Sequence, residues 1–152
     1  METNGMNFLL NDFGKSIGIN ELAFDENGYC CLMFDQVVVN IELIENSKRF
    51  FLYTHLGEIP LEKREEFYSL LLEADFFNKE TADGTLGIDR ESNIVALTYQ
   101  RPYTGLDLEK FEKILENYVN AAEHWTKKIQ EFPASFETIF TMEAFPEGGL
   151  VV

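Results

Sequence analysis

The sequence predicts an α+β domain built, in order, from a helix, three antiparallel strands, a second helix, two strands and a third helix. A chain of 152 residues with 45% hydrophobic and 14% aromatic content has enough apolar side chains for one compact core. Apolar residues recur at helical spacing in three segments, and stretches rich in Val, Ile, Phe and Tyr lie between them. Separate helices and strands without an internal repeat indicate a single α+β domain.

The first helix is predicted from about Asn4 to Gly18, because apolar side chains recur there once per helical turn. These residues are Met6, Leu10, Phe13 and Ile17. Phe8 and Leu9 lie off this stripe. The helix therefore carries more apolar surface than one core contact requires.

Three strands are expected next. Glu21–Phe24 leads into a tight hairpin turn at Asp25–Gly28, whose Asn-Gly end supplies the positive φ values that such turns need. Tyr29–Ile44 is expected to be one long strand with a bend at Asp35-Gln36, because this pair contains no glycine and makes a poor two-residue turn. The third strand is predicted over Arg49–Leu56.

The second helix is predicted from Pro60 to about Phe77, since proline suits a first helical turn and acidic residues follow it. Its stripe at helical spacing consists of Phe67, Leu70, Leu71 and Ala74. Further apolar side chains lie outside the stripe, namely Leu61, Tyr68, Leu72, Phe76 and Phe77. A surface helix of a monomer does not need so much apolar area, so the pattern indicates a protein contact.

A hairpin of two strands, Thr85–Ile88 and Asn93–Gln100, precedes the last helix, which is predicted from Asp107 to about Glu131. The apolar seam of this helix steps by three and four residues and consists of Leu108, Phe111, Leu115, Tyr118, Ala122, Trp125 and Ile129. The predicted organisation is therefore one domain over residues 1–131 and an acidic, Phe-containing tail over residues 132–152, which either folds back or is flexible.

Charge excludes several classes of function. The formal net charge is −15, from 27 acidic and 12 basic residues. Such a surface repels phosphate backbones and anionic lipids, so neither nucleic-acid binding nor membrane insertion is expected. No apolar stretch reaches the roughly 18 residues of a spanning helix, and Met1–Gly5 lacks the pattern of a signal peptide. A cytoplasmic protein is expected.

Motifs for chemistry are incomplete in this sequence. Gly14-Lys15-Ser16 lacks the earlier glycine of a phosphate-binding loop and falls within a predicted helix. His55 and His124 have no Cys or His neighbour at metal-ligand spacing. Cys30-Cys31 is neither a redox pair nor a disulfide framework, and both side chains are expected to be small buried hydrophobes. The sequence therefore predicts no enzyme, and no catalytic, cofactor or metal site.

A strongly acidic domain with surplus apolar residues on its first two helices is typical of a binding protein, because exposed apolar patches usually become interfaces. Three stretches of strand and turn residues, at Leu22–Gly28, at Phe51–Gly57 and from Leu86 to Asp107, point to a family. Together with the element order, they resemble the class I type III secretion chaperones, the CesT or Tir-chaperone family of Gram-negative bacteria. The resemblance extends from about Met6 to Glu131.

The resemblance implies a homodimer around which a partly extended effector protein wraps its N-terminal segment before secretion, without ATP hydrolysis. That role requires an apolar groove for side chains of the effector, here called the client, and an exposed strand edge for its backbone. The predicted groove residues are Phe8, Leu9, Phe13, Leu32 and Phe34. The predicted dimer residues, placed where the family usually has its dimer contact, are Phe67, Leu71, Phe76 and Leu86.

Two other classes remain open at the level of sequence. An acidic nucleic-acid mimic or inhibitor that binds another protein fits the net charge of −15. Its negative charge would be expected to form a dense run, whereas residues 61–131 intersperse acids with Lys and Arg. A small enzyme that uses carboxylates in a cleft is disfavoured, because no acid/base pair or cofactor motif is visible.

Overall fold

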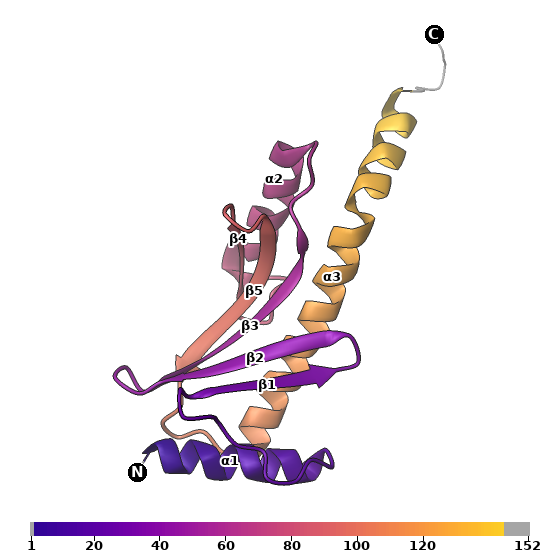
Figure 1. Ribbon diagram of the computed structural model, residues 1–152. Coiled ribbons are helices and arrows are strands. Elements are labelled where there is room, and N and C mark those ends of the chain that lie inside the picture. The colour runs from indigo at the N-terminus through magenta and orange to yellow at the C-terminus, as the bar shows by residue number, and fades with distance from the viewer. Residues whose placement is uncertain (1, 145–152) are drawn as a thin grey trace.

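The fold was described from a computed structural model, which defines the backbone of residues 2–144 and the side chains of residues 5–132. The chain forms α1 (Glu2–Ser16), β1 (Tyr29–Phe34), β2 (Val37–Ile44), β3 (Arg49–Glu58), α2 (Arg64–Asp75), a short 3-10 helix η1 (Phe76–Asn78), β4 (Thr85–Asp89), β5 (Ile94–Pro102) and α3 (Leu108–Ala144) (Figure 1). The five strands form one antiparallel sheet in the order β1-β2-β3-β5-β4. The predicted α+β element order is confirmed.

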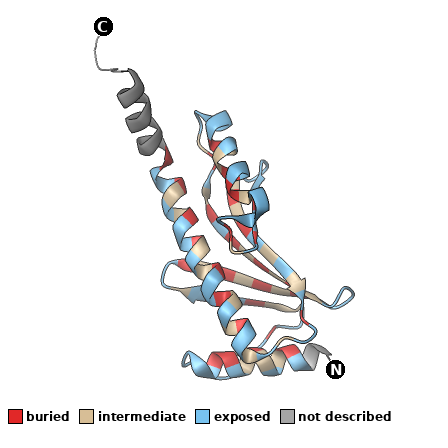
Figure 2. Ribbon diagram, turned by 180° about the vertical axis from the view of Figure 1, so that it is seen from behind, coloured by how far each residue is buried: buried red, intermediate tan, exposed pale blue. Residues whose placement is uncertain are grey.

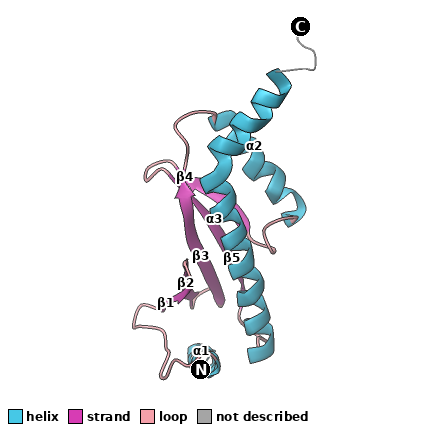
Figure 3. Ribbon diagram, turned by 90° about the vertical axis from the view of Figure 1, so that its right-hand side faces the viewer, coloured by secondary structure: helices cyan, strands magenta, loops and turns pink. Residues whose placement is uncertain are grey.

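Helices α2 and α3 pack on the same face of the sheet, as the side view shows (Figure 3). Helix α3 lies along β3 and β2, α2 lies beside β4, and α1 crosses the β1 end of the molecule and contacts α3. Gly57 permits the close approach of α3 to β3, because a Cβ at this position would lie 2.9 Å from Ile129 Cγ2.

The core lies between the sheet and α3 (Figure 2). Alternate residues of the central strands turn toward the helix, and the seam of α3 packs against them. A buried polar contact joins the two layers: the Tyr118 hydroxyl lies 2.9 Å from the Leu97 carbonyl oxygen and 3.0 Å from Thr54 Oγ1. Thr54 Oγ1 in turn donates to the Val38 carbonyl oxygen at 2.8 Å. These bonds satisfy polar groups that are costly to bury alone.

The predicted long strand over Tyr29–Ile44 is wrong, because the chain reverses at Asp35-Gln36 and forms β1 and β2. Phe34 pairs with Val37 across this two-residue turn. Asp35 adopts the left-handed conformation, with a φ of 55°, that glycine usually supplies, and aspartate tolerates it better than most residues. The turn therefore forms without glycine.

The predicted strand over Glu21–Phe24 is also wrong. The Phe24 side chain is buried, and its backbone N–H donates to Asn7 Oδ1 of α1 at 3.0 Å, which ties this segment to the helix rather than to the sheet. The turn at Asp25–Gly28 does form, and Asp25 Oδ1 accepts hydrogen bonds from the N–H groups of Asn27 and Tyr29. The three strands before α2 are thus β1, β2 and β3.

Helix boundaries differ at two places from those predicted. Helix α2 begins at Arg64 instead of Pro60, after Lys63 in the left-handed conformation. Helix α3 continues past Glu131 to Ala144, and the buried Phe132 ring packs on Phe67 with centroids 5.1 Å apart. The predicted tail over residues 132–152 therefore starts inside α3. Its last part, residues 145–152, lies outside the described residues.

Candidate functional site: a groove beside an open strand edge

A groove of about 400 Å³ lies where the end of α1, the end of β1 and the first half of α3 meet. Its apolar lining consists of Phe13, Ile17, Phe34, Leu115 and Val119. We call this feature the α1–α3 groove. Its walls come from three segments that are far apart in the sequence, and packing between aromatic rings sets their spacing.

Phe13 of α1 packs against the other two walls of the groove. This side chain is buried, and its ring lies 6.4 Å from the Phe34 ring and 5.4 Å from the Phe111 ring, centroid to centroid. The Phe13–Phe111 pair is edge-to-face, a favourable arrangement for aromatic rings. Ile17, one turn further along α1, is 43% exposed and forms an accessible wall. The groove thus has a rigid floor and an accessible apolar side.

The rim of the groove is acidic. Glu112 and Glu116 project from successive turns of α3, and both contribute to the groove lining. Glu116 Oε2 lies 3.8 Å from Lys113 Nζ, but both side chains are more than 60% exposed, so this pair is solvated and weak. The groove therefore suits an apolar side chain that is followed or preceded by a basic one.

Next to the groove, β1 forms one edge of the sheet. Phe34 and Val37 flank a two-residue turn, so they form a hydrogen-bonded pair, and such pairs alternate along an antiparallel ladder. The backbone groups of Cys31 and Met33 consequently point away from β2. The backbone N–H and C=O of Tyr29 also point away from β2, but both already form hydrogen bonds with Asp25. Tyr29 N–H donates to Asp25 Oδ1, and Asp25 N–H donates to the Tyr29 carbonyl oxygen. The edge available for a partner strand is the part nearest the groove.

The opposite edge of the sheet, β4, is covered differently. Leu86 N–H, which points away from β5, donates to Asp75 Oδ1 of α2 at 2.8 Å. Burial raises the pKa of the Asp75 carboxyl, while the hydrogen bond from Leu86 opposes that rise. Asp75 thus occupies a backbone donor that an edge strand would otherwise offer to another chain.

Asp75 leads to a prediction about pH. A carboxyl with a raised pKa in the fold stabilises the protein most below its unfolded pKa of about 3.9, and that contribution is lost as the pH rises through the folded pKa. Asp75→Asn keeps an acceptor oxygen without charge, so we expect it to maintain or raise the free energy of unfolding at neutral pH. Asp75→Ala leaves Leu86 N–H without its acceptor and should lower that free energy by about 1–3 kcal/mol.

Urea denaturation at about pH 4 and about pH 7 checks this expectation. The asparagine variant should show a smaller change between the two pH values than the unsubstituted protein. An asparagine variant that is as unstable as the alanine variant at neutral pH would contradict it.

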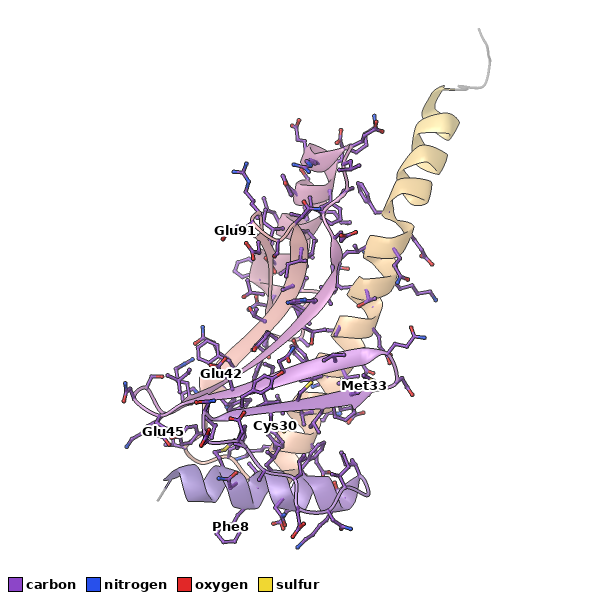
Figure 4. The ribbon with its side chains drawn as sticks, in the orientation of Figure 1. Phe8, Cys30, Met33, Glu42, Glu45 and Glu91 are labelled. Carbon is purple, nitrogen blue, oxygen red and sulfur yellow. The ribbon has the colours of Figure 1, made fainter. Side chains whose placement is uncertain are left out.

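The structure brings together two of the five predicted groove residues, Phe13 and Phe34. Leu32 is only 4% exposed and faces the core. Phe8 is 74% exposed and points away from the sheet, beside a separate shallow hollow, and Leu9 is half-buried (Figure 4). Because α1 buries one face on the body of the protein, its apolar residues divide between core and surface. Whether these residues contact a client stays a prediction.

The sequence does not identify three of the apolar residues that line the groove. Leu115 belongs to the apolar seam of α3 and Ile17 to the apolar stripe of α1, and such stripes are typical of residues that face a core. Val119 lies one position after Tyr118, just off the seam, and this offset was the only signal in the sequence. Periodicity identifies an apolar face but does not show where a second helix leaves part of it uncovered.

The predicted dimer residues also fall into a buried group and an exposed one. Phe67, Leu71 and Leu86 are at most 5% exposed and pack within their own protomer, so their side chains offer no surface in this conformation. Phe76 is 61% exposed. It adjoins two further exposed side chains, Leu72 and Phe77. We call Leu72, Phe76 and Phe77 the α2 stripe.

The α2 stripe arises because α2 turns its Phe67–Leu71–Ala74 side toward the core. The opposite side of the helix therefore carries the exposed apolar residues. The Phe76 and Phe77 rings lie 4.5 Å apart, and Lys79 Nζ lies 5.7 Å from the Phe76 centroid. Phe77 adopts a left-handed conformation, with a φ of 56°, which is costly for an aromatic residue. The strained turn displays both rings to solvent.

Gly14-Lys15-Ser16 lies in the last turn of α1 and has a packing role. A Cβ at Gly14 would lie 2.7 Å from Leu22 Cβ, so glycine is needed for close contact, and Ser16 Oγ donates to the Phe13 carbonyl oxygen. Within residues 5–132, His, Cys, Asp and Glu side chains form no cluster of three that suits a metal ion. Among the helices of the described region, none combines the length and apolarity that membrane crossing requires.

The two cysteines differ. Cys30 is buried, and burial, with smaller contributions from Cys31 and Asp25, raises the pKa of its thiol to about 11, so it stays protonated. Cys31 is exposed, which corrects the prediction that both are buried. The difference follows from the alternation of side chains along β1, which turns adjacent residues to opposite faces.

Comparison with known proteins places the chain in a family. The model of the Tir chaperone protein (CesT) family matches residues 8–126. The transcriptional anti-antiactivator ExsC of Pseudomonas aeruginosa is 32% identical over 130 residues, which cover 84% of this chain and 87% of ExsC. A crystal structure of the ExsC–ExsE complex matches with a TM-score of 0.69 and 31% identity, over 82% of this chain and 93% of that chain.

The HopA1–SchA chaperone–effector complex has a similar fold. It matches with a TM-score of 0.67 and 18% identity, over 82% of this chain and 95% of that chain. The family match spans α1 to the middle of α3, the same elements that build the groove and the open β1 edge. This protein is therefore a member of the Tir chaperone protein (CesT) family, the type III secretion chaperones.

Proposed function

We propose that this protein is a type III secretion chaperone that binds the N-terminal segment of a secreted effector in a partly extended state. The observation that carries the proposal is the position of the α1–α3 groove directly beside the open part of β1. A groove and a strand edge side by side can bind the side chains and the backbone of one extended chain together. Effector complexes of relatives, such as HopA1–SchA, support the same use.

The mechanism follows from strand geometry. A client strand forms hydrogen bonds with the outward backbone groups of Cys31 and Met33, which continues the sheet by one strand. Its alternate side chains turn toward the face that α3 covers and enter the groove. Basic side chains nearby gain from Glu112 and Glu116 on the rim. Binding needs no nucleotide, because backbone pairing and apolar burial supply the free energy.

The proposed working form is a homodimer of about 35 kDa, twice the 17.5 kDa of one chain. The α2 stripe supports this, because exposed aromatic and leucine side chains next to one another on a strained turn are unfavourable in water unless a partner covers them. A two-fold axis near the stripe places it against its own copy, as isologous interfaces require.

A second candidate function is control of gene expression through a protein antagonist. ExsC is named an anti-antiactivator, and it shares 32% identity with this chain. An acidic protein that binds and neutralises another protein is also close to the inhibitor class that the net charge of −15 admits. In this role the client and a regulatory protein would compete for the same chaperone.

The proposed function is tested by purifying the chain from its native cell under gentle conditions and digesting the complex with a protease. We expect a protected segment near the N-terminus of a secreted protein, bound to a chaperone dimer. Recovery of a regulatory protein that the client displaces would favour the second candidate. Recovery of a DNA-binding enzyme that DNA displaces would contradict both.

Groove variants should separate binding from stability. Ile17→Ser removes accessible apolar area, so client binding should weaken by about 1–4 kcal/mol while the melting temperature changes little. Leu32→Ala empties a buried site and should lower the free energy of unfolding by about 2–5 kcal/mol. Phe8→Ser, on the other side of α1, is the matched control. Isothermal titration and thermal melting of the same variants check this expectation. Loss of client binding in Phe8→Ser alone would place the client site on the Phe8 side of α1 instead of in the groove.

A further inference from the structure

The sheet face opposite α2 and α3 carries an apolar surface that the groove does not use. Views from opposite sides show both helices on one face and, for the described residues, an open second face (Figures 1 and 2). Cross-strand partners share a face, so the register identifies the side chains on the open side. We define the outer sheet surface as Tyr29, Met33, Val38, Glu42, Phe51 and Tyr53.

The apolar character of the open face stops at the middle of the sheet. In register, Phe51 lies opposite Gln100, and Tyr53 lies opposite Thr98. Apart from Asn40 and Glu42, the β1–β3 half is therefore mostly aromatic and aliphatic, whereas the facing positions of β5 are polar. An antiparallel sheet that simply faces water would be polar on both halves of its open face. The asymmetry indicates that a partner covers only the β1–β3 half.

Hydrogen bonds preorganise the outer sheet surface. The Tyr29 hydroxyl donates to Asn40 Oδ1, and Asn40 Nδ2 donates to the Tyr53 carbonyl oxygen at 3.1 Å. Asn40 lies between Cys31 and Tyr53 in register, so these bonds link three strands. The Tyr29 and Asn40 side chains are therefore already ordered before a partner covers this surface, which lowers the entropic cost of binding. Tyr residues in such a setting are typical of interface centres.

The negative charge of the outer sheet surface favours a basic partner segment. Glu42 is paired in register with Tyr29 on one side and Phe51 on the other, so a carboxylate sits among the rings. Burial, and after it the nearby Glu42 carboxylate, raise the pKa of the Tyr53 hydroxyl. With a net charge of −15, the chain also disfavours an acidic partner, including a second copy.

We infer that the outer sheet surface is a second docking site, which takes an apolar protein segment carrying a lysine or arginine positioned against Glu42. This site is distinct from the α1–α3 groove, because successive residues of β1 turn to opposite faces. Leu32 faces the α3 side, whereas Met33, which is 70% exposed, faces the open side (Figure 4). Both sites can therefore be occupied at once, so the protein can hold a client and a second segment simultaneously.

The probe for this site is a short fluorescein-labelled peptide with leucines on one side and lysines on the other. A peptide of the same length with glutamates in place of the lysines is its charge control. In amide NMR spectra of the protein, the lysine peptide should shift resonances of the β1–β3 strands. Met33→Ser and Glu42→Gln should each weaken its binding about tenfold. Neither substitution removes a core side chain, so melting temperatures should stay unchanged.

Two controls make the inference falsifiable. Thr98→Ser alters the polar half of the same face, and Glu116→Gln removes an equally negative side chain at the groove rim. Neither should change the peptide-induced shifts of the β1–β3 strands, and Glu116→Gln should act only on peptide that enters the groove. Loss of the β1–β3 shifts in Glu116→Gln, or shifts confined to Phe13 and Val119, would overturn the second site by showing either groove binding or general attraction to acid. An assembly larger than a dimer that Met33→Ser reduces would assign the surface to a second copy instead, and would overturn it too.

Discussion

Replacing Phe76 with glutamate is expected to convert the proposed dimer of about 35 kDa into a monomer of 17.5 kDa at micromolar concentration. Phe76 is 61% exposed in one protomer, so the folded monomer tolerates a polar group there. In the dimer the same carboxylate would be buried without a partner, which costs about 3–5 kcal/mol. That cost corresponds to a weakening of dimerisation by about a hundredfold to several thousandfold.

The matched control is Phe8→Glu, which places the same charge on an equally accessible phenylalanine of α1, away from the α2 stripe. Light scattering and sedimentation across a range of concentrations measure the result. Phe8→Glu should remain dimeric, and both variants should melt at nearly the same temperature. A Phe76→Glu protein that stays dimeric would contradict the placement of the interface, and a monomeric unsubstituted protein would contradict the dimer itself.

Replacing Trp125 with alanine is expected to lower the free energy of unfolding by about 3–5 kcal/mol, the largest loss of stability for a single substitution considered. Trp125 is fully buried in α3, and its Nε1–H donates to the Glu80 carbonyl oxygen at 2.8 Å. Lys128 Nζ lies 4.9 Å from the Trp125 centroid and also 3.6 Å from Glu80 Oε1. The substitution therefore leaves a cavity and releases the segment that follows the α2 stripe.

Trp125→Phe separates these two effects, because it retains most of the apolar volume but lacks the N–H donor. We expect a smaller loss, about 1–2 kcal/mol, from the Glu80 carbonyl group that loses its partner. Urea denaturation measures both variants. Since the segment after the α2 stripe is anchored through Glu80, the alanine variant should also dimerise less tightly. An alanine variant within about 1 kcal/mol of the unsubstituted protein would show that this anchor is unimportant.

The proposed two-site arrangement gives this protein a further capacity. A chaperone that holds its client along the β1 edge leaves the opposite face of the same sheet free for a second, cationic segment. A regulator bound there would sense the client only through the shared strand β1. Binding of one segment would then alter the affinity for the other by a measurable coupling free energy, which is the test that such a role must pass.

The three helices and the last two strands followed from local patterns alone. The seam of α3 and the stripe of α1 are set by residues three and four positions apart, and most of these side chains are buried, whereas Ile17 at the end of the α1 stripe is 43% exposed. The acidic composition likewise predicts, without any coordinates, that a phosphate backbone is a poor partner. Such conclusions depend on short-range spacing or on sums over the chain, so a sequence contains them completely.

Tertiary structure alone decided which apolar residues are accessible. Phe67 and Leu72 are both apolar residues of α2, yet one is fully buried and the other is 70% exposed, because the body of the protein covers only one side of the helix. The turn at Asp35 depends in the same way on the sheet that holds its left-handed conformation. The α1–α3 groove combines Phe13, Phe34 and Val119, and their proximity results from the packing of three distant segments, which no local pattern encodes.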